Sequence, residues 1–213
     1  RRADETAKRF PQARRFADFC KMLDEIHGQI DAVLVATPDH THAVAAVVAM
    51  KLGKHVYCEK PLTHSVEEAL AVYKAWKESG RVMQVGVQSM SDPRWRMAND
   101  LIKQGRIGHV MQAQTSYYRN SSVGQWRYYE LKETMTPKSI DWKMFLGTEF
   151  GLAPEQPFDR AVFAQWRCYW DFGGGMYTDL FVHQLSHLIT AMGVRFPRRV
   201  VGDLSNTDRV MEG

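Results

Sequence analysis

The first half of the chain alternates between two kinds of segment. Strands are expected at 30–36, 55–57 and 81–87, and helical patterns fill the intervals at 41–52 and 65–79. The run at 30–36 is short, apolar and rich in β-branched residues. Run 30–36 is nearly continuous, which is typical of a strand buried on both faces. Strand–helix–strand order at this spacing predicts βαβ units and a parallel sheet. The chain is therefore expected to be an α/β protein.

The second predicted helix carries signals at both of its ends. Ser65 followed by Glu68 fits a capping box, and Gly80 stands where a helix ends in a left-handed residue. For the first helix we expect Asp39 or Thr41 to cap the N-terminus with its side chain.

The pattern changes after residue 90. A helix is expected at 94–104. The alternation of polar and apolar residues at 109–119 predicts an antiparallel strand with one face exposed to solvent. The glycine triplet 173–175 opens a predicted helix that runs to about residue 192, and 200–203 is read as a further strand.

These patterns predict a boundary near residue 90. Residues 1–90 have the pattern of a parallel sheet with connecting helices, and residues 91–213 have the pattern of helices with antiparallel strands. The chain begins with Arg1 instead of methionine and ends without a terminating pattern, so we interpret it as an internal fragment.

Composition excludes several classes of protein. Apolar residues make up 45% and charged residues 24% of the 213 residues, which predicts a packed core and excludes disorder. The net charge of +4 is scattered, so nucleic-acid binding is not expected. No apolar run reaches the ~20 residues that cross a bilayer. Three cysteines are an odd number without metal-type spacing. We expect a cytoplasmic protein, or a periplasmic one if a leader precedes residue 1.

Ligands of parallel sheets bind beyond the carboxyl ends of the strands, which draws attention to the loops at 37–42, 58–62 and 88–93. Lys60 lies in the second loop beside Pro61, which restricts the backbone of its neighbour. A lysine partly removed from water can move protons or stabilise an alkoxide. The alternative is a surface pair of Glu59 and Lys60 at a turn.

Two further segments have both a functional and a structural interpretation. The first loop offers small and polar groups for a cofactor edge, or it caps the helix while His42 packs against it. Trp166 and Arg167 suit contact with an anion or a ring, or they are a buried aromatic residue beside a snorkelling arginine.

Asp179, His183 and His187 are each four residues apart, which places them on one helical face. An aspartate one turn before a histidine can orient the imidazole as a general base. Two histidines four apart are also half of a zinc site. However, Gln184 stands where the zinc motif has Glu, so we expect no metal and a packed His187.

Aromatic residues are dense between Tyr117 and Trp170. Sugars stack on such rings, so these residues are candidates for a sugar site. Buried aromatic residues of a core or an interface are the alternative.

The segments AVLVATPDHTHAVAAVVAMKLGKHVYCEKPL and QWRCYWDFGGGMYTDLFVH together resemble the Gfo/Idh/MocA oxidoreductases, over nearly the whole chain. The resemblance implies an incomplete Rossmann-type dinucleotide-binding domain in residues 1–90, followed by a truncated α+β domain with an open antiparallel sheet in residues 91–213. It implies NAD or NADP as cofactor and places Gln88 near the nicotinamide. It implies catalytic roles for Lys60, Asp179 and His183. It also implies a set of cofactor-side residues, namely Thr37, Pro38, His42, Glu59, Trp166 and Arg167.

The chain departs from the family in two ways. Ser186 stands where family members commonly have an acid, which bears on the substrate class. No G-x-G-x-x-G occurs, and by resemblance that phosphate-binding turn belongs upstream of residue 1.

The resemblance implies hydride transfer between the nicotinamide and a sugar, polyol or similar hydroxyl compound. His183 would accept the hydroxyl proton with Asp179 orienting it, and Lys60 would stabilise the alkoxide; the roles of His183 and Lys60 are exchangeable. The alternatives are a redox-neutral NAD-dependent glycoside-cleaving enzyme, a non-catalytic sugar- or nucleotide-binding relative, and a zinc-dependent hydrolase. By resemblance we expect a homo-oligomer for the full-length protein.

Overall fold

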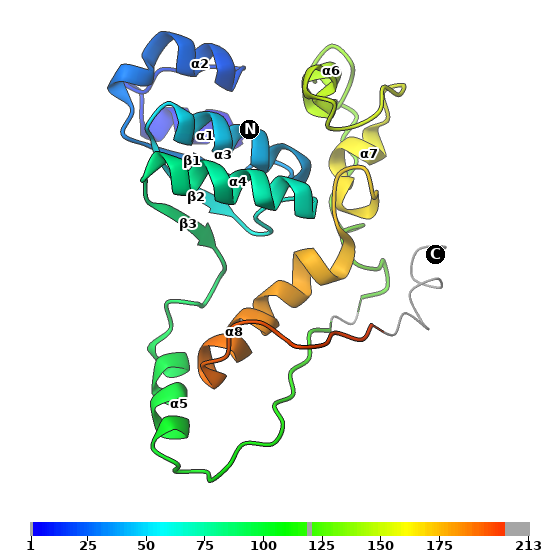
Figure 1. The fold of residues 1–213 in the computed structure, drawn as a ribbon. Helices are drawn as coiled ribbons and strands as arrows, with labels where there is room; N and C mark the ends of the chain where they lie inside the picture. Colours follow the sequence, from blue (N-terminus) through cyan, green and yellow to red (C-terminus); the bar gives the residue numbers. More distant parts are fainter. Residues whose placement is uncertain (1, 119–120, 203–213) are drawn as a thin grey trace.

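The computed structural model describes residues 2–118 and 121–202. Its centre is a parallel sheet of strand order β1-β2-β3, with β1 at Ala32–Val35, β2 at His55–Glu59 and β3 at Met83–Gly86 (Figure 1). Helix α3 (His42–Lys51) connects β1 to β2, and α4 (Val66–Ser79) connects β2 to β3. The predicted βαβ arrangement is confirmed.

One face of the sheet forms the first core. Val35 pairs in register with Cys58, and Cys58 pairs with Val85. Val35 and Cys58 are 3% and 0% exposed, because α3 and α4 cover this face with small and apolar side chains that include Ala46 and Val72. Small side chains such as Ala46 allow the helices to pack closely on the strands.

The opposite face of the sheet is exposed. Leu34 and Tyr57, which pair in register, are 67% and 41% exposed. The prediction that strand 30–36 is buried on both faces is therefore wrong. Successive side chains of a strand point to opposite faces, and α3 and α4 cover only one of them.

The ends of the two connecting helices differ. The capping box of α4 is confirmed, since Ser65 Oγ accepts from Glu68 N at 3.2 Å and the Glu68 carboxylate accepts from Ser65 N at 3.1 Å. Gly80 ends α4 with a φ of 63°. At α3 the expected side-chain cap is wrong. Thr41 occupies the N-cap position, but its hydroxyl donates to the Pro38 carbonyl at 2.8 Å.

Helices dominate the rest of the described chain. The N-terminal α-helices are α1 (Arg2–Arg9) and α2 (Phe19–Ile26), and those after the sheet are α5 (Pro93–Lys103), α6 (Trp142–Leu146), α7 (Arg160–Ala164) and α8 (Val182–Met192). A π-helical turn, η5 (Tyr177–Phe181), leads directly into α8. The 3₁₀ turns are η1 (His27–Gln29), η2 (Asp39–Thr41), η3 (Thr148–Phe150) and η4 (Trp166–Cys168).

A second core lies among α6, α7 and the segment before η5. Its buried residues are Leu146, Ala153, Val162, Trp166 and Phe172. Much of the aromatic density of the sequence is used here. Phe145, for example, packs against both Trp142 and Phe172, with ring centroids 5.1 and 5.2 Å away.

The predicted antiparallel strands are not formed in the described residues. Residues 109–118 and 200–202 have no strand structure, while Arg119 and Asp203 lie outside the described residues. An alternating pattern specifies which face of a strand is apolar, but a strand forms only where another strand pairs its N–H and C=O groups. The described chain supplies no such neighbour to 109–118.

Helix α8 lies against α5 and passes the carboxyl end of β3 (Figure 1). Asn99 of α5 donates its side-chain amide to the Ala191 carbonyl at 3.0 Å. Gly193 ends α8 with a φ of 66°, and a Cβ there would lie 2.7 Å from the Asn99 amide. This packing holds the helix face that carries His183 and His187 beside the sheet.

Ser65→Ala is expected to lower the free energy of unfolding by about 1 kcal/mol, because it removes the side-chain acceptor at the start of α4. Chemical denaturation measures the change. Ser65→Thr is the matched control and should retain most of the stability, since threonine also caps helices. Equal losses in the two variants would contradict a capping role.

Candidate active site

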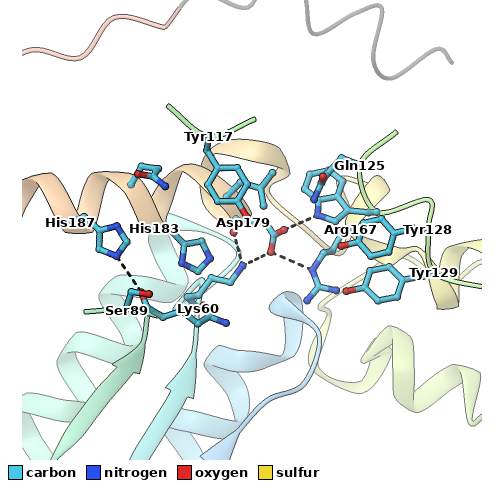
Figure 2. A pocket seen from close by; sticks show the side chains of 14 residues that line it. Lys60, Ser89, Tyr117, Gln125, Tyr128, Tyr129, Arg167, Asp179, His183 and His187 are labelled. Atoms are coloured by element: carbon cyan, nitrogen blue, oxygen red, sulfur yellow. Dashed lines mark hydrogen bonds and ion pairs between the residues drawn. The ribbon is translucent and has the colours of Figure 1, made fainter. Parts of the chain in front are cut away.

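A cleft with a volume of about 500 Å³ lies where β2 and β3 end opposite η5 and α8 (Figure 2). The strand-end loops contribute one wall, α8 another, and the aromatic segment around residue 126 a third. The lining residues are Lys60, Gln88, Ser89, Tyr117, Gln125, Trp126, Tyr128, Tyr129, Arg167, Asp179, Leu180, His183, Gln184 and His187.

An ion pair between Lys60 and Asp179 joins two walls of the cleft. Lys60 Nζ donates to Asp179 Oδ1 at 2.6 Å and to the Asp179 carbonyl at 2.5 Å. The two side chains are 12% and 7% exposed. Because one group comes from the end of β2 and the other from η5, the contact fixes the strand edge to the helix that carries His183.

Asp179 also receives two other donors. Trp126 Nε1 donates to Oδ2 at 2.7 Å, and Arg167 Nε donates to Oδ1 at 3.3 Å (Figure 2). Burial by itself raises the pKa of Asp179, but the hydrogen bond and charge of Lys60, with help from Arg167 and Trp126, outweigh it and lower the pKa. Asp179 is therefore a carboxylate with both oxygens engaged.

His183 lies one turn beyond Asp179, as the spacing predicts, and lines the same cleft. Its ring stacks on Tyr117 with centroids 6.2 Å apart and planes at 24°. Asp179 belongs to the π-helical turn and His183 to α8, so the helix widens between them. Single π turns of this kind are frequent at functional sites.

The structure brings five of the predicted site residues into the cleft and leaves five outside its lining. Inside are Lys60, Gln88, Arg167, Asp179 and His183. Outside are Thr37, Pro38, His42, Glu59 and Trp166.

His42 is buried beneath the strand-end loops. It is 1% exposed, and its ring nitrogens lie 2.8 Å from the carbonyl oxygens of Thr37 and Pro61. The side chain links the loop after β1 to the loop after β2. It thus holds the backbones of these two loops together beneath the strand ends.

Trp166 is 9% exposed and belongs to the second core. The guanidinium of Arg167 lies over its ring, with Cζ 4.1 Å from the ring centroid. The core tryptophan therefore supports the arginine, which reaches the cleft.

His187 is packed, in agreement with the structural interpretation of its position. It is 8% exposed, stacks on Trp95 and lies with Nε2 3.2 Å from the Gln88 carbonyl. Among the residues that the structure describes, no three His, Cys, Asp or Glu side chains gather in a way that would hold a metal ion.

Asp39 is a buried acid near the cleft that the sequence suggested only as a helix cap. It is 1% exposed, and its Oδ2 has no hydrogen-bond partner within residues 2–118 and 121–202. Burial, followed by the charge of Asp179, raises the pKa of Asp39 to about 7, against the opposing charges of Arg167 and Lys60. The cleft therefore has a second carboxyl group behind it that titrates near neutral pH.

Sequence reasoning did not single out Trp126, Tyr128 or Tyr129. Trp126 is 5% exposed and bonded to Asp179, while the rings of Tyr128 and Tyr129 lie 4.7 Å apart at the rim. The aromatic density of this region was the available signal. It could not separate the rings that line the cleft from those that fill the second core.

A family model for oxidoreductases with an NAD-binding Rossmann fold, GFO_IDH_MocA, matches residues 1–87. The match identifies residues 1–87, less than half of the chain, as similar to the NAD-binding part of the Gfo/Idh/MocA oxidoreductases. This agrees with the parallel sheet of β1, β2 and β3.

Two curated relatives illustrate the similarity. The chain is 33% identical over 131 residues to levoglucosan dehydrogenase of Pseudarthrobacter phenanthrenivorans, a match that covers 59% of this chain and 33% of the relative. It is 42% identical over 79 residues to scyllo-inositol 2-dehydrogenase (NAD(+)) of Bacillus subtilis, which covers 37% and 23%. The chain thus spans a third or less of the length of these two relatives.

The solved structure of levoglucosan dehydrogenase in complex with NADH is similar over 90% of this chain and 42% of the other, with 25% identity and a TM-score of 0.58. The similarity extends well beyond the residues of the family model. In the described residues, we find no helix with the length and apolar character needed to span a membrane.

The buried Asp39 predicts a pH-dependent stability. An unfolded aspartate titrates near 3.9, whereas folded Asp39 titrates at about 7, so the folded state binds an extra proton between these values. Stability from this group is present at low pH and is lost as pH rises through 7. Denaturation of Asp39→Asn and the wild type should therefore diverge from pH 4 to 7, by up to ~4 kcal/mol in favour of the variant, and stay parallel above pH 7. A pH-independent difference would contradict the burial of an acid.

Proposed function

We propose that the protein is an NAD(P)-dependent oxidoreductase that transfers a hydride between the nicotinamide and a sugar, polyol or related hydroxyl compound. The observation that carries the proposal is the meeting of Lys60, Asp179 and His183 at the carboxyl edge of the parallel sheet. Two relatives are named as dehydrogenases of levoglucosan and scyllo-inositol, and these names support a carbohydrate-like substrate.

The residues present fit the nicotinamide end of the cofactor. Gln88 and Ser89 follow β3 directly and present exposed side chains to the cleft, which is where open parallel sheets bind ligands. Arg167 offers a cation on the opposite wall. When bound, the cofactor supplies the hydride acceptor or donor; a glycine-rich phosphate turn is absent from the sequence given.

Lys60 and His183 supply the groups for proton transfer and for stabilising the alkoxide. His183 accepts the proton of the substrate hydroxyl, and the Lys60 ammonium stabilises the alkoxide that forms. The two roles are exchangeable, because both groups line the same opening. Asp179 holds the Lys60 ammonium in place through two oxygen atoms, which reduces the cost of aligning it during the reaction.

The rim of the cleft suits a polyhydroxylated substrate. Tyr117, Tyr128 and Tyr129 supply ring faces on which a sugar can stack, and their hydroxyls add polar groups. Lys60 and Arg167 provide donors to hydroxyl oxygens.

We also propose the two-domain division at residue 90, with the dinucleotide-binding part at 1–90 and the substrate part at 91–213. The two separate core clusters support it. Assembly into a homo-oligomer and a cytoplasmic location stay predictions from the sequence, to be tested by sedimentation and by fractionation of the complete protein.

Lys60→Met in the complete protein is expected to lower turnover by on the order of 100-fold or more, because it removes the cation that stabilises the alkoxide. NADH formation with a panel of polyols and sugars measures it. Lys51→Met, at the exposed end of α3, is the matched control and should be active.

Full turnover in Lys60→Met would refute the proposed role. The same assay separates the redox-neutral alternative, since a dehydrogenase accumulates NADH with its substrate, whereas a glycoside-cleaving enzyme releases a free aglycone without net NADH.

A further inference from the structure

The turn after β3 contains an unusual backbone conformation. Ser89 has a φ of 66°, in the left-handed region that is unfavourable for a residue other than glycine. Gln88 and Ser89 are both exposed and both line the cleft. A strained turn persists only where its surroundings hold it, so the contacts of this turn decide how the two side chains meet a ligand.

Two aromatic N–H groups hold consecutive carbonyls of this turn. His187 Nε2 lies 3.2 Å from the Gln88 carbonyl, and Trp95 Nε1 donates to the Ser89 carbonyl at 3.1 Å. A carbonyl only accepts, so Nε2 is the protonated nitrogen of His187 in this contact. The two rings are themselves stacked, with centroids 4.4 Å apart and planes at 9°.

The rings come from the two helices that pack against each other. Trp95 belongs to α5 and His187 to α8, where it lies one turn beyond His183. The turn at the end of β3 is thus fastened to the helix that carries the proposed proton acceptor. This fastening complements the ion pair of Lys60 with Asp179, which fixes the end of β2 to the same helical segment (Figure 2).

We propose that His187 is a positioning residue, which together with Trp95 clamps the Gln88–Ser89 turn in the geometry that meets the nicotinamide end of a dinucleotide. The proposal rests on the proposed function for the identity of the ligand. It goes beyond packing, because packing needs only a flat ring on Trp95, whereas the clamp needs the ring N–H at the Gln88 carbonyl.

His187→Phe separates these two roles. Phenylalanine preserves a flat ring against Trp95 and removes the N–H. His187→Gln is the matched rescue, since it retains an N–H donor on a side chain of similar reach. The measurements on the complete protein are hydrogen exchange of the backbone amides of residues 87–92, NADH affinity by fluorescence titration, and the thermal midpoint.

When His187 holds the turn as proposed, His187→Phe should speed hydrogen exchange of the backbone amides of residues 87–92 by about fivefold. This is the size expected for the loss of one hydrogen bond. Its Kd for NADH should rise by on the order of tenfold, with KM for the dinucleotide affected more than kcat. The thermal midpoint should change little, and His187→Gln should recover part of the affinity.

Unchanged exchange in His187→Phe, or faster exchange with unchanged NADH affinity, would overturn the clamp. Equal defects in the Phe and Gln variants would also overturn it, because they would assign the effect to the imidazole shape alone. If the wild type binds no dinucleotide, the proposed function fails, and the exchange comparison still decides whether His187 holds the turn.

Discussion

The buried pair of Lys60 and Asp179 is the contact on which the rest of the cleft depends. Both side chains are largely removed from water, at 12% and 7% exposure. Without Lys60, the Asp179 carboxylate would have only the more distant Arg167 as a cationic partner. Breaking such a pair by removing one partner typically costs 3–5 kcal/mol. The pair therefore fixes the position of η5 against the end of β2. It also places His183, one turn further on, above the carboxyl edge of the sheet.

Imidazole rings bonded to backbone carbonyls hold the loops around this pair. His42 links the carbonyls of Thr37 and Pro61 beneath the cleft, and His187 lies against the carbonyl of Gln88 at its side. Each ring is buried and joins segments that are distant in the sequence. His42 and His187 thus hold loops in place, whereas His183 lines the cleft together with Lys60.

Charge in the cleft is balanced by groups from four segments. Lys60 and Arg167 meet Asp179, and Asp39 lies buried behind them with a pKa raised to about 7. An additional ionised acid next to Asp179 is disfavoured by repulsion and by burial, so Asp39 is the group that takes up a proton. The lysine can then interact with a substrate oxygen while Asp179 holds its position.

Local sequence patterns were sufficient for the βαβ order, the capping box of α4 and the helix ending at Met192, because spacings of two, three and four residues act within one element. The spacing of four also predicted that Asp179 and His183 share a helical face. Lys60 had two interpretations from its neighbours alone, and only the family resemblance favoured the catalytic one. The strand expected at 109–119 was wrong, since alternation specifies a face and not a pairing partner. Only the tertiary structure decided that Asp179 meets Lys60, 119 residues away, and that some aromatic residues line the cleft while others fill the core. Such contacts depend on how whole elements pack, and residue spacing along the chain does not carry that information.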